Sequence, residues 1–241
     1  MKKLFGFCGV AVLCFTLFSC ASSKVPLSDI GSTSILAVVG SSAVPYYEMV
    51  DGEYVDNDGL INQAVNAVFG QDNPEITGAK DRVDLCVDTM ELLLEENAGL
   101  TVIPKDTLVN SNSYKEFSND IFGFLETYVY ATGYKKITEL NGKKARILMN
   151  EIGSNSLITA KFDFYKYLVD GSKLKGNIGA YLDAEFCLYD NTGKLIIQEE
   201  VKIYSTDKTE VSLTKYDNQV LCDMFPELIE QAVNTFIVNH L

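Results

Sequence analysis

The sequence predicts an α/β fold of mixed α+β type: a single mixed sheet with an antiparallel three-strand portion at its C-terminal end, and helices packed on it. Two observations predict this fold. Residues 35–104 run through an apolar stretch, a helical pattern and a second apolar stretch, which is typical of a parallel crossover. From about residue 155, apolar and polar residues alternate, as in antiparallel strands with one buried face.

The first strand is expected over residues 35–40, where Ile-Leu-Ala-Val-Val-Gly predicts burial on both faces. A short helix is expected over residues 60–69, and a polar loop over residues 70–78. Residues 81–97 predict a long helix, because their apolar side chains recur at i, i+3, i+4 and i+7. Residues 100–103 then predict the second strand.

The middle of the chain predicts further helices. Residues 113–134 are rich in aromatic side chains and indicate one helix and a loop. Residues 142–152 indicate another helix, because Asn141 can cap its start and Gly153 can end it.

The antiparallel portion is expected to follow. Its three strands are predicted over residues 158–165, 178–189 and 195–203. Asp-Asn-Thr-Gly at residues 190–193 predicts the hairpin turn between the last two strands. A final helix is expected over about residues 217–239, and Pro226 should kink or restart it.

The N-terminus has the features of an export signal. Lys2 and Lys3 precede apolar residues 4–18, a run shorter than the roughly 20 residues that span a membrane. The run ends in Leu-Phe-Ser-Cys at residues 17–20, which resembles the lipobox of bacterial lipoproteins, where the cysteine is acylated. The alternative is an ordinary secretory signal followed by a chance cysteine.

We therefore expect residues 1–19 to be a lipoprotein signal peptide, residues 20–34 a lipidated tether, and residues 35–241 a single α/β domain. Acylation of Cys20, with palmitate among the chains, would anchor the protein to a membrane, because two or more chains make a stable anchor. Ala21 after the cysteine resembles lipoproteins that are sorted to the outer membrane and face the periplasm.

Charge and residue counts argue against several classes of partner and of chemistry. The net charge of −13 disfavours nucleic acid and anionic lipid surfaces as partners. The single histidine, His240, argues against histidine-based catalysis and histidine-rich metal sites. Outside the signal and Cys20, the cysteines are Cys86, Cys187 and Cys222. Three buried thiols, or one disulfide and one free thiol, both fit this spacing.

No motif commits the chain to a reaction, a cofactor or a metal ion. Asp-Asn-Asp-Gly at residues 56–59 is similar to part of a calcium loop, but Tyr54 and Val65 occupy its first and twelfth ligand positions. Asp183 and Glu185 lie two residues apart on the polar face of an expected strand, which favours a solvent-facing role over an acid–base pair. The sequence therefore predicts a protein that is not an enzyme.

Three tyrosines are the candidate protein-binding residues. Tyr46, Tyr47 and Tyr54 lie between the first strand and the first long helix, and tyrosine is enriched at protein interfaces. Packing over the sheet edge is the alternative. The predicted function is that of a membrane-anchored lipoprotein that binds other envelope proteins in assembly or regulation. The alternative function is to carry a small apolar ligand in a cavity beside the sheet.

Three stretches carry a resemblance to a known group of proteins. They are residues 35–40, residues 99–104 and residues 189–196, the last with the form Asp-x-x-Thr-Gly-Lys-hydrophobic. They resemble the envelope lipoproteins around the curli-secretion channel protein, the lipoprotein activator of penicillin-binding proteins and the N-terminal domain of TolB. Asn155 departs from the aspartate that this group often has before the strand. The resemblance implies this fold and protein binding at the cell envelope without catalysis.

Overall fold

The computed structural model describes residues 26–47, 49–50, 53–54, 73–118, 127–137 and 140–241. Cys20, the helix expected at residues 60–69 and the calcium-like residues 56–59 lie outside the described residues. Within the described part of the chain, no helix is both long and apolar enough to cross a membrane.

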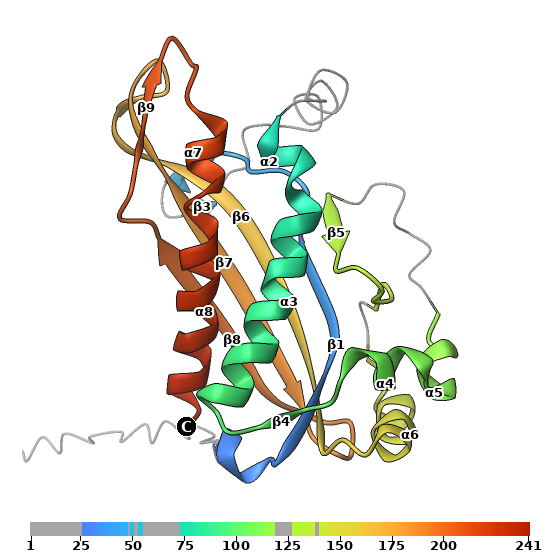
Figure 1. Cartoon of the computed structure of the whole chain (residues 1–241). Helices are drawn as coiled ribbons and strands as arrows, with labels where there is room; N and C mark the ends of the chain where they lie inside the picture. Colours follow the sequence, from blue (N-terminus) through green and yellow to red (C-terminus); the bar gives the residue numbers. More distant parts are fainter. Residues whose placement is uncertain (1–25, 48, 51–52, 55–72, 119–126, 138–139) are drawn as a thin grey trace, which may run out of the picture.

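A seven-stranded mixed sheet lies at the centre of the fold (Figure 1). Its strands are β1 (Ser32–Ser41), β4 (Thr101–Val102), β5 (Tyr128–Tyr130), β6 (Ser156–Ser172), β7 (Lys175–Tyr189), β8 (Leu195–Tyr204) and β9 (Thr209–Ser212). β1 runs parallel to β4 and β6, whereas β6, β7 and β8 are antiparallel. The predicted mixed sheet with an antiparallel C-terminal portion is confirmed. β2 (Met49–Val50) and β3 (Glu53–Tyr54) form a separate two-stranded sheet.

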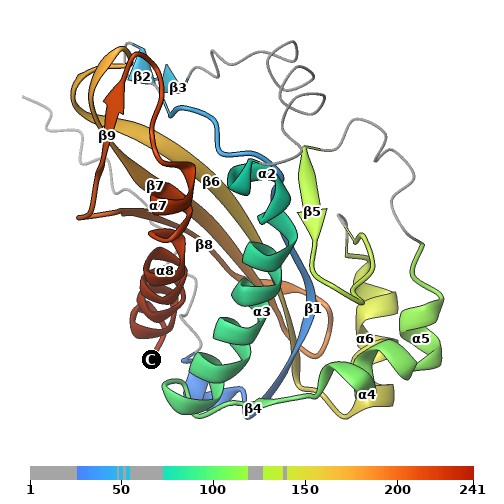
Figure 2. The ribbon, with the colours of Figure 1, turned by 45° about the horizontal axis from the view of Figure 1, so that its top comes forward.

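Helices cover the two faces of the sheet unequally. They are α2 (Pro74–Thr77), α3 (Ala79–Glu96), α4 (Lys105–Asn110), α5 (Asn112–Lys115), α6 (Gly142–Ile152), α7 (Asn218–Cys222) and α8 (Phe225–Asn239). α3 and α8 lie side by side across one face, which we call the inner face (Figures 1 and 2). α4, α5 and α6 pack near one end of the other, outer face, where Leu148 and Met149 join a cluster with Leu157.

The main core fills the space between the inner face and the two long helices. Alternation along β6 places Phe162 and Phe164 on this face, and both are fully buried. Phe162 meets Phe186 edge to face at 5.7 Å, and Phe164 meets Phe225 of α8 at 5.0 Å. Burying one such side chain stabilises the fold by about 1.5–3 kcal/mol.

α6 begins and ends where the sequence predicts. Asn141 accepts hydrogen bonds from the backbone N–H groups of Lys143 and Lys144, at 3.0 and 3.3 Å. Gly153 ends the helix with a left-handed φ of 71°, which glycine adopts without steric cost. The expected restart of the last helix is also confirmed, because Pro226 lies in the first turn of α8.

The folded part of the chain begins before residue 35. Leu27, in a 3₁₀ turn over Leu27–Asp29, is fully buried in the main core. Its N–H donates to the carbonyl of His240 at 2.7 Å, which joins the two ends of the described chain. Residues 27–34, which the sequence analysis assigns to the tether, are therefore part of the folded body.

Several short elements differ from the sequence-based expectations. The loop expected at residues 70–78 contains α2, because Asn73 caps the helix and Pro74 fits its first turn. β5 and β9 were not expected; each is short and lies at a sheet edge, where periodicity gives little signal. Cys86, Cys187 and Cys222 are all free thiols, so the alternative with one disulfide is wrong.

A buried ion pair fixes α2 to the sheet. The Lys166 ammonium lies 2.9 Å from the Glu75 carboxylate and also donates to the Val44 carbonyl. The Tyr216 hydroxyl donates to the other Glu75 oxygen at 2.5 Å. Arg82 donates to the Glu75 backbone carbonyl at 2.7 Å, and burial lowers the pKa of this guanidinium. Each buried charge therefore has a partner, as burial requires.

Replacing Lys166 with alanine should lower the free energy of unfolding by about 3–5 kcal/mol, because it leaves the Glu75 carboxylate buried without its cation. Replacing both partners, Glu75→Leu with Lys166→Met, should cost much less, because no unpaired charge remains. Urea unfolding of the three proteins measures the difference. Equal losses in the single and the double variant would show that the unpaired charge is not the cause.

Candidate binding surface

The outer face of β6, β7 and β8 is organised in rows that run across the three strands. The register places Tyr165 opposite Tyr181 and Tyr181 opposite Tyr204. Because side chains alternate along each strand, the next outward-facing row along the strands consists of charged residues. The helices α4, α5 and α6 cover the end of this face near Leu157, whereas Tyr204 is 47% exposed.

The tyrosine row is tightly stacked. The rings of Tyr165 and Tyr181 are 5.6 Å apart, and those of Tyr181 and Tyr204 are 4.4 Å apart, with interplanar angles of 27° and 23°. Tyr47 lies against this row, 4.4 Å from Tyr181 and 5.5 Å from Tyr165. Tyr167 meets Tyr204 edge to face at 5.1 Å. Burial raises the pKa of Tyr181, so its hydroxyl stays protonated. We call these five residues the tyrosine cluster.

Two of the three tyrosines predicted to bind protein, Tyr46 and Tyr47, lie on different sides of the chain. Tyr47 joins the tyrosine cluster, whereas Tyr46 packs against the main core on the other side of the chain. Tyr46 forms a β-bridge with Lys166, whose ammonium lies 5.2 Å from the Tyr46 ring. Tyr54 belongs to β3, and its side chain lies outside the described residues. The sequence prediction missed the four tyrosines of the sheet, although Tyr165 and Tyr181 occupy polar-face positions of two expected strands.

A charged strip borders the tyrosine cluster. Asp163 lies directly opposite Asp183, and Glu185 directly opposite Glu200. Such like-charged pairs are destabilising. Lys161 and Lys202 offset part of this repulsion with contacts of 2.7 Å to Asp163 and 2.9 Å to Glu200. The four carboxylates, Lys161 and Gln198 line a hollow of about 350 Å³. As predicted, Asp183 and Glu185 lie on the outer, polar face.

Burial, and then the neighbouring Glu200 carboxylate, raises the pKa of Asp183 to about 6. This exceeds its ordinary value of 3.8, so the folded chain binds the proton more tightly than the unfolded chain. The contribution of Asp183 to stability therefore falls as the pH rises from about 4 to about 6. Above about pH 6 the ionised Asp183 carboxylate destabilises the fold.

Asp183→Asn should therefore raise the free energy of unfolding by about 1 kcal/mol at neutral pH and leave it nearly unchanged near pH 4. Urea unfolding at the two pH values measures the gain. The exposed residue Asp207, changed to asparagine in the same way, should show no such pH-dependent gain. An equal gain at both pH values would show that ionisation of Asp183 is not the cause.

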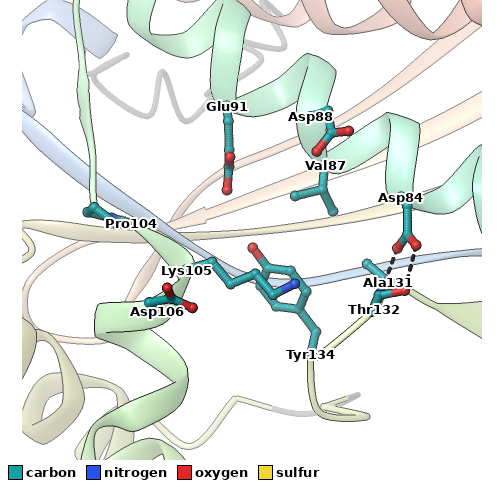
Figure 3. A pocket seen from close by; sticks show the side chains of 10 residues that line it. All are labelled: Asp84, Val87, Asp88, Glu91, Pro104, Lys105, Asp106, Ala131, Thr132 and Tyr134. Carbon is teal, nitrogen blue, oxygen red and sulfur yellow. Dashed lines mark hydrogen bonds between the residues drawn. The ribbon is translucent and has the colours of Figure 1, made fainter.

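A second hollow, of about 470 Å³, lies between α3, the start of α4 and the segment that follows β5 (Figure 3). Its lining includes the acidic side chains of Asp84, Asp88, Glu91 and Asp106. Asp84 accepts hydrogen bonds from the N–H and the hydroxyl of Thr132, at 2.6 and 2.5 Å. Four carboxylates in its lining distinguish this hollow from the apolar cavity that the alternative function expects.

The chemistry available in the described part of the chain is limited. His240, the one histidine, lies with its Nε2 2.5 Å from a Glu199 oxygen and its ring 5.3 Å from Phe236. It is therefore remote from the outer face, because Glu199 alternates with the outward-facing Glu200. Among the described residues, no group of three or more His, Cys, Asp or Glu side chains is placed to hold a metal ion.

Comparisons with known proteins add the following. No family model and no curated protein matches the chain. The C-terminal domain of LpoB from Salmonella enterica aligns with 72% of this chain and 83% of its own length, at 10% identity and a TM-score of 0.31. Lipoprotein GNA1162 from Neisseria meningitidis aligns with 86% of this chain and 97% of its own length, at 13% identity and a TM-score of 0.34. These two matches confirm the predicted resemblance to envelope lipoproteins. At such low identity and TM-score, the likeness carries no argument about function.

Proposed function

We propose that this chain is an envelope lipoprotein, anchored through Cys20 in the outer membrane and facing the periplasm, that binds another envelope protein without catalysing a reaction. The lipobox-like residues 17–20 support the anchor. The surface that supports protein binding is the tyrosine cluster with the charged strip beside it. A polar and aromatic surface of this kind is typical of protein interfaces.

The observation that carries the proposal is the stacking of four sheet tyrosines and Tyr47 beside an open part of the outer face. Stacking fixes the rings before a partner arrives, so little side-chain entropy is lost on binding. Tyr204 presents one edge of this rigid cluster to solvent. Exposed tyrosines at the centre of an interface often contribute more than about 1 kcal/mol to binding.

A photo-reactive residue at position 204 tests the proposal in whole cells. It should cross-link to one envelope protein, whereas the same residue at Val238, which is exposed on α8, should not. With the captured protein identified, Tyr204→Ala should weaken its binding about tenfold, and Val238→Ala should leave it unchanged. Both variants should melt within a few degrees of the parent. Equal cross-linking at the two positions would place the partner elsewhere.

A further inference from the structure

The β6–β7 turn and the turn after β9 lie at the end of the sheet away from the C-terminus (Figure 1), and each carries an exposed leucine. Leu174 lies in the turn between β6 and β7, and Leu213 in the turn after β9. The Leu213 N–H donates to the Leu174 carbonyl at 2.8 Å, so the two turns are joined. The side chains are nevertheless 63% and 80% exposed. We call these two leucines, with Lys175 and Lys215, the two-leucine tip.

Leu213 lies in an exposed turn whose backbone conformation is unfavourable for a leucine. Ser212 and Lys215 exchange two backbone hydrogen bonds of 2.9 and 3.0 Å around Leu213 and Thr214. Both central residues have positive φ, 52° and 67°, as in the type I′ turns that favour Asn-Gly. A bulky and a β-branched residue are strained there. A strained turn that displays an exposed leucine indicates a functional position rather than a stabilising one.

The tip also differs in charge from the rest of the chain. Residues 171–175 and 212–216 contain Lys173, Lys175 and Lys215 but no acidic residue, although the net charge of the chain is −13. An apolar knob flanked by ammonium groups fits a recess with an apolar floor and an acidic rim.

The hollow of Figure 3 combines apolar and acidic side chains. Val87, Ala131 and Tyr134 line it together with the carboxylates of Asp88, Glu91 and Asp106, and the Lys105 ammonium lies 5.2 Å from the centre of the Tyr134 ring. Burial, and then the neighbouring Asp88, raises the pKa of Glu91. An added cation beside these carboxylates would relieve that repulsion.

We propose that the two-leucine tip of one copy docks into this hollow of a second copy of the chain. Leu213 would lie against Val87 and Ala131, while Lys175 and Lys215 would pair with carboxylates of the lining such as Asp88 and Asp106. The contact joins two different surfaces, so it is heterologous and builds a ring or an open row of copies. It leaves the tyrosine cluster of each copy available to another protein.

A charge exchange tests the docking. The purified full-length chain, studied by sedimentation in density-matched detergent, should self-associate with a Kd on the order of micromolar. A tip variant, Lys175→Glu with Lys215→Glu, and a hollow variant, Asp88→Lys with Asp106→Lys, should each be monomeric. Their equimolar mixture should associate again, because each variant then meets a surface of opposite charge.

A second variant separates docking from folding. Leu213→Asn with Thr214→Gly supplies the residues that the turn favours, so the melting temperature should rise while the Kd of self-association weakens about tenfold or more. A wild-type chain that stays monomeric, or a mixture that fails to associate, would overturn the proposal. So would binding of the monomer to phosphatidylglycerol vesicles that is lost in the Leu213 variant, because the tip would then contact lipid instead.

Discussion

Phe162→Asp should abolish the cooperative fold. Phe162 is fully buried on the inner face and packs edge to face on Phe186. Removing a buried phenylalanine costs about 3–5 kcal/mol, and an unpaired carboxylate in the same site adds several more. This sum reaches the total stability of an ordinary domain, about 5–15 kcal/mol. Circular dichroism should show no cooperative thermal transition.

The adjacent residue provides the matched control. Lys161 precedes Phe162 in β6 but points to the outer face, where its side chain is 40% exposed and pairs with Asp163. Lys161→Gln removes this partly exposed ion pair, which is worth about 1 kcal/mol or less, and the contact of the ammonium with the Tyr128 ring at 4.8 Å. It should therefore shift the melting temperature by a few degrees. Equal damage from both changes would contradict the assigned faces of β6.

Cys20→Ala should release the protein from the membrane. Acyl chains contribute about 0.8 kcal/mol per buried CH₂, so losing them removes the free energy that holds the protein at the bilayer. The variant should lose incorporation of labelled fatty acid and move to the aqueous phase in detergent partition. The control variant Cys222→Ala, which removes a free thiol of the folded body, should still incorporate labelled fatty acid and stay in the detergent phase. A Cys20→Ala protein that stays in the detergent phase would require another anchor.

Local signals predict much of the fold. α6 is bounded by an asparagine cap and a left-handed glycine, and both act within one turn of the chain. The alternation along β6 and β7 requires only a buried and an exposed face, so Phe162 and Leu182 lie inside as expected. α2 was missed although Asn73 caps it and Pro74 fits its first turn, because it is only four residues long and its Glu75 pairs with Lys166, which lies far away in the sequence.

The candidate surface was harder to predict, because it depends on register. Tyr165, Tyr181 and Tyr204 form one row only because the β6–β7 and β7–β8 pairings bring them opposite one another. A shift by one residue would move the tyrosines to the inner face. The adjacent residues Tyr46 and Tyr47 likewise go to different sides of the chain, a difference that residue type alone does not reveal.

The central claim is that a lipid on Cys20 holds this folded body at the membrane. The intact mass of the protein purified from its native membranes tests it most directly. We predict a chain that begins at Cys20, with the added mass of a diacylglyceryl group and a further acyl chain. A chain that retains Met1, or one cleaved at another position without added lipid, would contradict it.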